Sequence, residues 1–298
     1  AVLLQRPSFG RAAFFITKGD TMPIVTINRG SYSRGKAVAE KLARKLGYEC
    51  VSRDILLDAS EEFHIPEIKL IRALHDAHSV LERFTNGKER YISYLYSALL
   101  QHARKDNIVY HGLAGQYFLR DIPHVLKVRI IADMEDRVQE EMRREGISAE
   151  KARYILKKDD EERRKWGLRV YGTDTWDSRL YDIVLHIRQL TVDDAVEILY
   201  GMVQKPAFEA TPQSRKQVED LALAARVKAR LSRLAPNIQV LAQDGKLYIH
   251  NVDMGAEHEL AEKIKNAAAQ VEGVAEVHYN MGVPPEQRDH INPFHNIS

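Results

Sequence analysis

A glycine-containing segment near the start of the chain has the residue types and the spacing that phosphate binding requires. Residues 30–37 match the spacing G-x-x-x-x-G-K. In loops of this spacing, backbone N–H groups and the positive end of a helix dipole converge on a phosphate, and the lysine adds a charge. A glycine-containing turn with an incidental lysine is the alternative interpretation. The expected nucleotide-binding residues are Gly30, Ser31, Tyr32, Ser33, Arg34, Gly35, Lys36 and Ala37.

Position 37 departs from this pattern, which has a Ser or Thr there to hold Mg²⁺ through a hydroxyl. Ala37 has no hydroxyl, although water can take its place because Mg²⁺ commonly keeps several waters. Asp54, which follows the second predicted strand, is the carboxylate that we expect to act on this ion, directly or through water. Nucleotide binding tolerates this change more easily than fast phosphoryl transfer does.

Strand and helix patterns around the segment predict the scaffold that positions it. Short apolar strands alternate with amphipathic helices as far as residue 203, which predicts an α/β fold with a five-stranded parallel sheet covered by helices on both faces. Ligands of such sheets bind beyond the carboxyl ends of the strands. The predicted strands are 24–27, 48–52, 107–111, 125–132 and 181–187.

The second half of the chain follows a different pattern. Residues 205–213 contain two prolines and are predicted to be a linker. Residues 214–283 predict a small α+β module of order αββαβ, with a hairpin turn at Asp244-Gly245. We expect residues 284–298 to form a tail and residues 22–204 to form the first domain.

Composition sets limits on the classes of function and partner. The net charge is +2, from 44 basic and 42 acidic residues, so the overall charge gives no reason to expect nucleic-acid binding. A single cysteine excludes an internal disulfide and fits a reducing compartment, and no run reaches the roughly 18 apolar residues of a membrane span. We therefore expect a cytoplasmic protein. Residues 1–21 are expected to be an extension upstream of a natural start at Met22.

Three segments, taken together, resemble the cytidylate kinase-like members of the nucleoside monophosphate kinase group of P-loop proteins. They are ITINRGSYSRGKAVAEKLARKLGYECVSRDIL, NIVYHGLAGQYFL, and VRIIADMEDRVQEEMRREGISAEKARYILKKDDEERRKW followed by YGTDTWDSRLYDIVL. The resemblance covers about residues 23–203. It implies a P-loop NTPase-type sheet, ATP and Mg²⁺ as cofactors, and a small phosphate-bearing acceptor such as a nucleoside monophosphate.

The same resemblance assigns roles to individual residues. Arg163 occupies the position of the family's lid arginine, and Lys158 or Lys165 would assist it in stabilising charge on the transferred phosphoryl group. A solvated, ion-paired helix face is the alternative for this charged segment. Acceptor binding is expected near Arg53, Asp54, His111 and Gly112.

Two positions complicate the acceptor site. Leu113 stands where cytidylate kinases carry an arginine for the acceptor's phosphate, which puts CMP in doubt as the acceptor. His111 could contact a phosphate or accept a proton, or it could simply be packed at a strand end. Trp166, Tyr171 and Trp176 are expected to serve packing rather than base stacking.

The C-terminal module resembles a BON domain, through Asp244-Gly245 and the sequence VEGVAEVHYNM. This resemblance implies a protein partner or a membrane surface for the module. Two functions remain: an ATP-dependent phosphotransferase, or a nucleotide-binding regulatory or docking protein with weak or no kinase activity. The oligomeric state, a homo-oligomer included, stays open.

Overall fold

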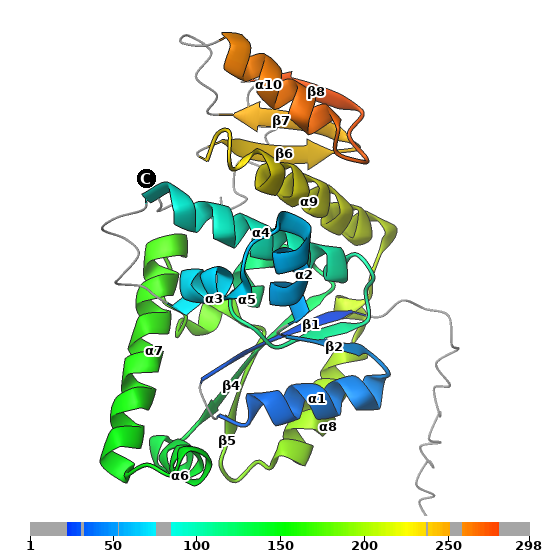
Figure 1. Cartoon of the computed structure of the whole chain (residues 1–298). Helices are drawn as coiled ribbons and strands as arrows, with labels where there is room; N and C mark the ends of the chain where they lie inside the picture. The colour runs from blue at the N-terminus through cyan, green and yellow to red at the C-terminus, as the bar shows by residue number, and fades with distance from the viewer. Residues whose placement is uncertain are drawn as a thin grey trace, which may run out of the picture.

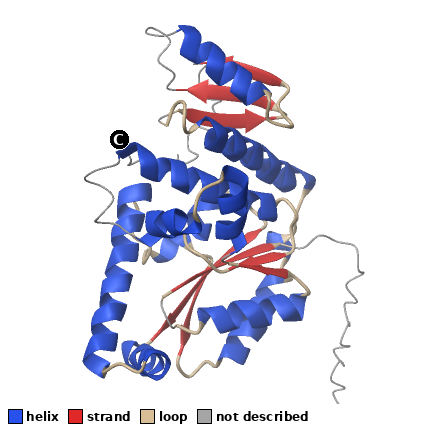
Figure 2. Cartoon of the chain, in the orientation of Figure 1, coloured by secondary structure: helices blue, strands red, loops and turns tan. Residues whose placement is uncertain are grey.

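The computed structural model describes residues 23–30, 33–52, 54–75, 85–236, 238–250 and 258–279. Two separate sheets organise these residues, a five-stranded one and a three-stranded one, with helices packed around both (Figure 2). The expectations for residues 1–21, for the tail 284–298, and for Ser31, Tyr32 and Arg53 lie outside the described residues.

The larger sheet is parallel throughout, as the alternating pattern predicts. Its strand order is β2-β3-β1-β4-β5, so β1 lies in the centre between β3 and β4. Because all the strands run in the same direction, their carboxyl ends meet at one edge, and the segment after β1 lies in the middle of that edge. The strands are β1 (Ile24–Arg29), β2 (Glu49–Val51), β3 (Ile108–Tyr110), β4 (Val125–Ala132) and β5 (Ile183–Ile187).

Helices cover both faces of this sheet (Figure 1). On one face, α1 (Gly35–Leu46) and α8 (Val192–Val203) pack against alternate residues of β1 and β4, such as Val25 and Val128. The other face carries the remaining core, to which Ile24 belongs. The helices there are α2 (Asp54–Phe63), α3 (Glu67–His75), α4 (Thr85–Ala103) and the short α5 (Gly115–Phe118).

Two charged helices, α6 (Met134–Glu145) and α7 (Ala149–Tyr171), form an arm beside the sheet. Their near ends share a small apolar cluster of Val138, Ala152 and Leu156. Arg137 of α6 forms a two-pronged ion pair with Asp160 of α7, at 2.8 and 2.9 Å. The chain between the two helices turns at Gly146, the C-cap of α6, whose φ of 64° a residue with a side chain rarely adopts.

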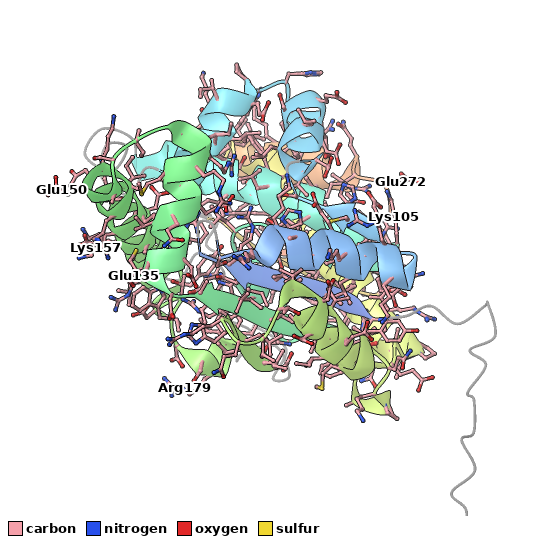
Figure 3. The ribbon with its side chains drawn as sticks, turned by 90° about the horizontal axis from the view of Figure 1, so that it is seen from below. Lys105, Glu135, Glu150, Lys157, Arg179 and Glu272 are labelled. Carbon is pink, nitrogen blue, oxygen red and sulfur yellow. The ribbon has the colours of Figure 1, made fainter. Side chains whose placement is uncertain are left out.

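The charged face of this arm projects outward. Figure 3 shows Glu135, Glu150 and Lys157 pointing away from the body of the molecule. Glu135 pairs with Arg153 at 2.8 Å, which fits the solvated-face interpretation for this part of α7. The far end of α7 differs, because Trp166, Val170 and Tyr171 belong to the main core. The pattern of residues 148–166 predicts a helix that ends at Trp166, whereas α7 continues to Tyr171.

The C-terminal part folds around the smaller sheet, of order β6-β7-β8. As predicted, β6 and β7 form a hairpin in which Asp244 and Gly245 have φ of 55° and 78°, the positive values that a two-residue hairpin turn of type I′ requires. Its elements are η2 (Pro206–Phe208), α9 (Pro212–Leu231), β6 (Gln239–Gln243), β7 (Lys246–His250), α10 (His258–Ala269) and β8 (Glu276–Tyr279).

Helix α9 is buried on two sides, by the main core and by the smaller sheet. Val218, Ala222 and Ala225 belong to the core that α4 shares, whereas Ala224 and Val227 pack under the smaller sheet. An ion pair also joins this helix to the segment after α4: Arg215 Nε lies 2.9 Å from Oδ2 of the buried Asp106. The predicted linker at 205–213 therefore leads directly into a shared core, and the domain boundary at 214 stays a prediction.

The start of α9 also differs from expectation. The apolar spacing predicts a helix from residue 218, but α9 begins at Pro212 because Thr211 and Ser214 form a reciprocal capping box. Thr191 and Asp194 have the spacing that predicts a helix start after residue 191, and their reciprocal capping hydrogen bonds are present at the start of α8. Among the described residues, no helix is both long enough and apolar enough to cross a membrane.

Candidate functional site

The turn between β1 and α1 leaves the first turn of α1 without side-chain caps from the described residues. Arg34 is the N-cap in the left-handed conformation (φ 62°), and its side chain makes no capping hydrogen bond. No acidic residue occupies the first helical turn. Backbone N–H groups at the start of a helix have no partner within the helix, so this terminus presents donors and a positive dipole end to an anion.

Tight packing fixes the position of this turn. Ser33 is buried, and its hydroxyl donates to the carbonyl oxygen of Gly30 at 3.0 Å. A Cβ on Gly35 would lie 2.6 Å from Cβ of Arg29, so only glycine fits where α1 crosses the end of β1. Lys36 and Arg34 are exposed, and Lys36 Nζ lies 3.6 Å from Glu40. Both cations can therefore reach a ligand beyond the helix terminus.

Helix α7 reaches this turn through Arg163, the expected lid arginine. Its Nη1 donates to the carbonyl oxygen of Arg29 at 2.9 Å, between residues 134 positions apart in the sequence. Burial lowers the pKa of the Arg163 guanidinium, and the carboxylates of Asp159 and Asp160 oppose this shift. Lys158 is exposed and does not line the cavity described next, so the structure does not bring it to this site.

A cavity of about 500 Å³ opens between this turn and α7. It lies over the face of β4 and β5 opposite to α1 and α8, where Arg129, Ile131 and Val184 point away from the core that those helices cover. Gly30 and Ser33 border it on the side of β1. Four arginines and two aspartates line it: Arg29, Arg129, Arg137, Arg163, Asp133 and Asp160.

Both aspartates of the lining are paired with basic side chains. Asp160 forms an ion pair with Arg137, and Oδ1 of Asp133 lies 2.9 Å from Nε2 of His186. Arg129 donates to the backbone oxygen of Thr175, and its guanidinium lies 5.9 Å from the ring of Trp176. The excess of arginines over aspartates makes the cavity positively charged.

The aromatic residues of this region have two different environments. Trp166 and Tyr171 are buried and pack edge to face with ring centroids 5.3 Å apart, as predicted. Trp176 is 51% exposed at the rim of the cavity, with the Arg164 guanidinium 4.4 Å from its ring centroid. Trp176 is therefore less closely packed than Trp166 and Tyr171, and a packing role for it stays a prediction.

Two buried donors in the lining have no hydrogen-bond partner in the described part of the chain. They are Nε2 of Gln116, whose residue is 2% exposed and whose side chain lies beside the Tyr117 hydroxyl, and Nε1 of Trp166, whose residue is 3% exposed. Sequence patterns did not single out Gln116, since a lone glutamine after a strand carries no signal. Arg129 did carry a sequence signal, because it interrupts the apolar strand 125–132 and lies on the same face of this strand as Lys127.

The predicted acceptor residues lie elsewhere on the same edge. Asp54, His111 and Gly112 do not line the cavity. Asp54 begins α2 and accepts a hydrogen bond from the backbone N–H of Ser52. A Cβ on Gly112 would lie 2.1 Å from the hydroxyl of Tyr110, so backbone and ring are in close contact there.

His111 is buried at the end of β3. Burial, and then the positive charge of Arg29, lower the pKa of its imidazole to about 4, so the ring is neutral near pH 7. Its Nδ1 has no hydrogen-bond partner among the described residues. A neutral, packed ring fits the interpretation that His111 is simply packed at the strand end. Its unused Nδ1 can still accept or donate one hydrogen bond.

The residues at this edge fit Mg²⁺ only as an ion that a nucleotide brings with it. No group of three or more His, Cys, Asp or Glu side chains within the described segments could hold a metal. Ala37 has no hydroxyl to offer, and Asp54 is a single exposed carboxylate. Phosphate oxygens and water would therefore have to supply most of the ligands.

The comparison with protein families covers this same region. A profile of the cytidylate kinase-like family matches residues 24–189, which is more than half of the chain and includes all five strands of the larger sheet. The chain belongs to the cytidylate kinase-like family. Helix α8 and the C-terminal sheet lie outside the matched residues.

Proteins similar to this member of the cytidylate kinase-like family include enzymes named cytidylate kinase. That of Pyrococcus furiosus is 20% identical over 197 residues, covering 65% of this chain and 96% of the relative. That of Methanopyrus kandleri is 34% identical over 109 residues, covering 34% of this chain and 56% of the relative. A solved structure of an uncharacterized protein from Eubacterium ventriosum is 21% identical and covers 61% of this chain and 99% of its own, with a TM-score of 0.47.

Proposed function

We propose that this protein is an ATP-dependent phosphotransferase of the nucleoside monophosphate kinase type, which transfers the γ-phosphoryl group to a small phosphate-bearing acceptor. The observation that carries the proposal is the hydrogen bond from Arg163 to the carbonyl oxygen of Arg29. It joins the charged arm to the turn before α1, so a phosphate bound at this turn would have the Arg163 cation beside it. Family membership and relatives named cytidylate kinase support the same reaction class.

Different residues of the chain would have different roles in such a transfer. The uncapped first turn of α1 would bind the phosphates of ATP, with Lys36 neutralising their charge. Mg²⁺ brought by the nucleotide would supply further positive charge, and Asp54 would act on it directly or through water. Arg163 would stabilise the transferred group, and the cavity over β4 and β5 would hold the acceptor. Catalysis of this kind rests on positioning and electrostatics, without a covalent intermediate.

The test is release of ADP from ATP and Mg²⁺ in the presence of a panel of nucleoside monophosphates. We expect acceptor-dependent turnover that Lys36→Ala lowers by about 10²-fold or more, as removal of one stabilising group typically does. Lys41→Ala is the matched control, because Lys41 lies on the same helix but pairs with Asp193 on α8 at 2.7 Å. ATP hydrolysis that no acceptor stimulates and that Lys36→Ala leaves intact would contradict the proposal.

A nucleotide-binding regulatory or docking protein is the second candidate, and two substitutions favour it. Ala37 offers no hydroxyl to the metal, and Leu113 lines the cavity where an arginine would bind a phosphate. The same assay separates the two: saturable ATP binding without turnover on any acceptor supports the second candidate.

A further inference from the structure

The lining of the cavity contains two buried hydrogen-bond donors that the described part of the chain leaves unused. Nε2 of Gln116 and Nε1 of Trp166 each have no hydrogen-bond partner there, although their residues are only 2% and 3% exposed. A buried donor without a partner costs free energy, and a ligand can remove this cost. Both residues line the same cavity as Arg129 and Arg163.

These groups define the chemistry of what would bind. An indole N–H can only donate, and the nitrogen of an amide side chain is likewise a donor. The aspartates of the lining are already paired with Arg137 and His186. Donors and positive charge together therefore favour a group that only accepts hydrogen bonds and carries negative charge, which describes an ionised phosphate monoester or a carboxylate.

We propose that Gln116, Arg129 and Trp166 form an anion subsite, which binds the acceptor of the reaction through a phosphate or carboxylate group. This assignment rests on the proposed function for the ligand's role as acceptor. It relocates the acceptor's anion from the expected position near Arg53, Asp54 and His111 to the face of β4 and β5. Arg129 also supplies the positive charge that Leu113 cannot.

The protein carries its own reporter for this subsite. Its two tryptophans, Trp166 and Trp176, both line the cavity, so intrinsic fluorescence responds to ligands there. The full chain is titrated at fixed ionic strength and without ATP, with sodium phosphate, sodium acetate, CMP and cytidine as the probes. We expect a saturable change with CMP and not with cytidine. Saturation by phosphate alone identifies a phosphate monoester as the group bound, and saturation by acetate alone identifies a carboxylate.

Variants separate this subsite from the turn before α1. We expect Gln116→Leu and Gln116→Glu to weaken binding of the saturating anion by about tenfold or more, since hydrogen bonds to charged groups are worth about 1.5–3 kcal/mol. Trp166→Phe, followed through Trp176, should weaken it similarly. Tyr171→Phe is the control, because its buried hydroxyl also has no partner in the described segments but does not line the cavity.

Three results would overturn the subsite: no saturable change with any probe, an equal response to cytidine, or binding that Lys36→Ala abolishes while Gln116→Leu leaves it intact. The subsite and the proposed function can fail separately. Gln116-dependent anion binding without acceptor-dependent turnover retains the subsite and rejects the kinase. Turnover that depends on Lys36, with an acceptor KM that Gln116→Leu leaves unchanged, retains the kinase and rejects the subsite.

Discussion

Single residues at the carboxyl edge of the sheet determine how closely its parts can approach. Gly35 is where this constraint is tightest, because α1 begins against the side chain of Arg29. His111 and Arg163 show a second effect, because burial lowers the pKa of both side chains. Each of these effects gives a prediction that one substitution can test.

We expect Gly35→Ala to destabilise the protein by about 1–3 kcal/mol, the usual cost of forcing extra volume into a packed site. Its new Cβ would lie 2.6 Å from Cβ of Arg29. Gly201→Ala is the matched control, because a Cβ there has no neighbour within 4 Å on helix α8, and alanine should stabilise that helix by up to about 1 kcal/mol. Urea unfolding measures both, and equal effects would contradict the steric argument.

The pH dependence of stability should report on His111. Its pKa is about 4 in the folded protein, below the 6.5 of an unperturbed histidine. Between these values the unfolded chain binds more protons, so the free energy of unfolding rises with pH across this window and falls as pH drops from about 6.5 to about 4. We expect His111→Gln to remove part of this slope, on the order of 1–3 kcal/mol over the window. Replacement of the exposed His64 by Asn is the matched control.

Arg163→Lys should lower kcat by about 10²-fold or more, with much less effect on the KM for ATP. A lysine keeps the charge but has no planar fork with which to hold the carbonyl oxygen of Arg29 and a phosphate together. Arg153→Lys serves as the control, since Arg153 lies on the same helix and pairs with Glu135 of α6 at 2.8 Å. A fall in ATP affinity with unchanged kcat would assign Arg163 to binding alone.

Among the helices, α9 packs in a way that its sequence pattern does not reveal. Adjacent residues on it face different cores: Ala225 packs with α4, and Ala224 packs under the smaller sheet. A helix with apolar residues on two sides cannot be assigned from its pattern to one partner or the other.

We expect the same substitution at these two positions to loosen different parts of the molecule. Ala225→Asp places a charge against α4 and should speed hydrogen exchange of α4, because burying an unpaired charge costs several kcal/mol. Ala224→Asp should speed exchange of β7 and leave α4 protected. If both variants lose protection in the same segments, α9 does not separate two cores.

The elements that the sequence predicts well are those with a strong local pattern. Strand β4 has the predicted bounds, 125–132, because an unbroken apolar run leaves little ambiguity. The short α5 was missed, since four residues carry no helical period. The cavity itself could not be predicted, because it forms between the turn before α1, the face of β4 and β5, and the distant helix α7. Local patterns do not show how elements far apart in the sequence pack together. The sequence therefore pointed to Arg163 through the family resemblance of its segment, but nothing in the sequence pointed to Gln116.

At the scale of the whole molecule, the two sheets are joined through a shared helix. We expect deletion of residues 214–298 to lower the melting temperature of the larger unit and to increase binding of an apolar dye, because the deletion uncovers the α4 face that Ala222 and Ala225 cover. Differential scanning calorimetry checks this. An unchanged melting temperature would show that α9 adds nothing to the larger core.

A role for the C-terminal module at a membrane or protein partner stays a prediction, and it should be tested on the full chain. The exposed face of the smaller sheet carries Lys246 paired with Glu276 at 3.2 Å, and Tyr248 stacked on His278. Co-sedimentation of the intact protein with anionic lipid vesicles separates a membrane surface from a protein partner.

The two-sided burial of α9 has a consequence for how the chain is made. Asp106 and Arg215, which pair in the finished protein, are 109 positions apart in the sequence. At a synthesis rate of about 5–20 residues per second, α4 leaves the ribosome roughly 5–20 s before its cover does. During this interval the apolar face of α4 has no native partner. Chaperone binding to nascent chains that end before Pro212, and its release once Leu231 has emerged, is the expected signature.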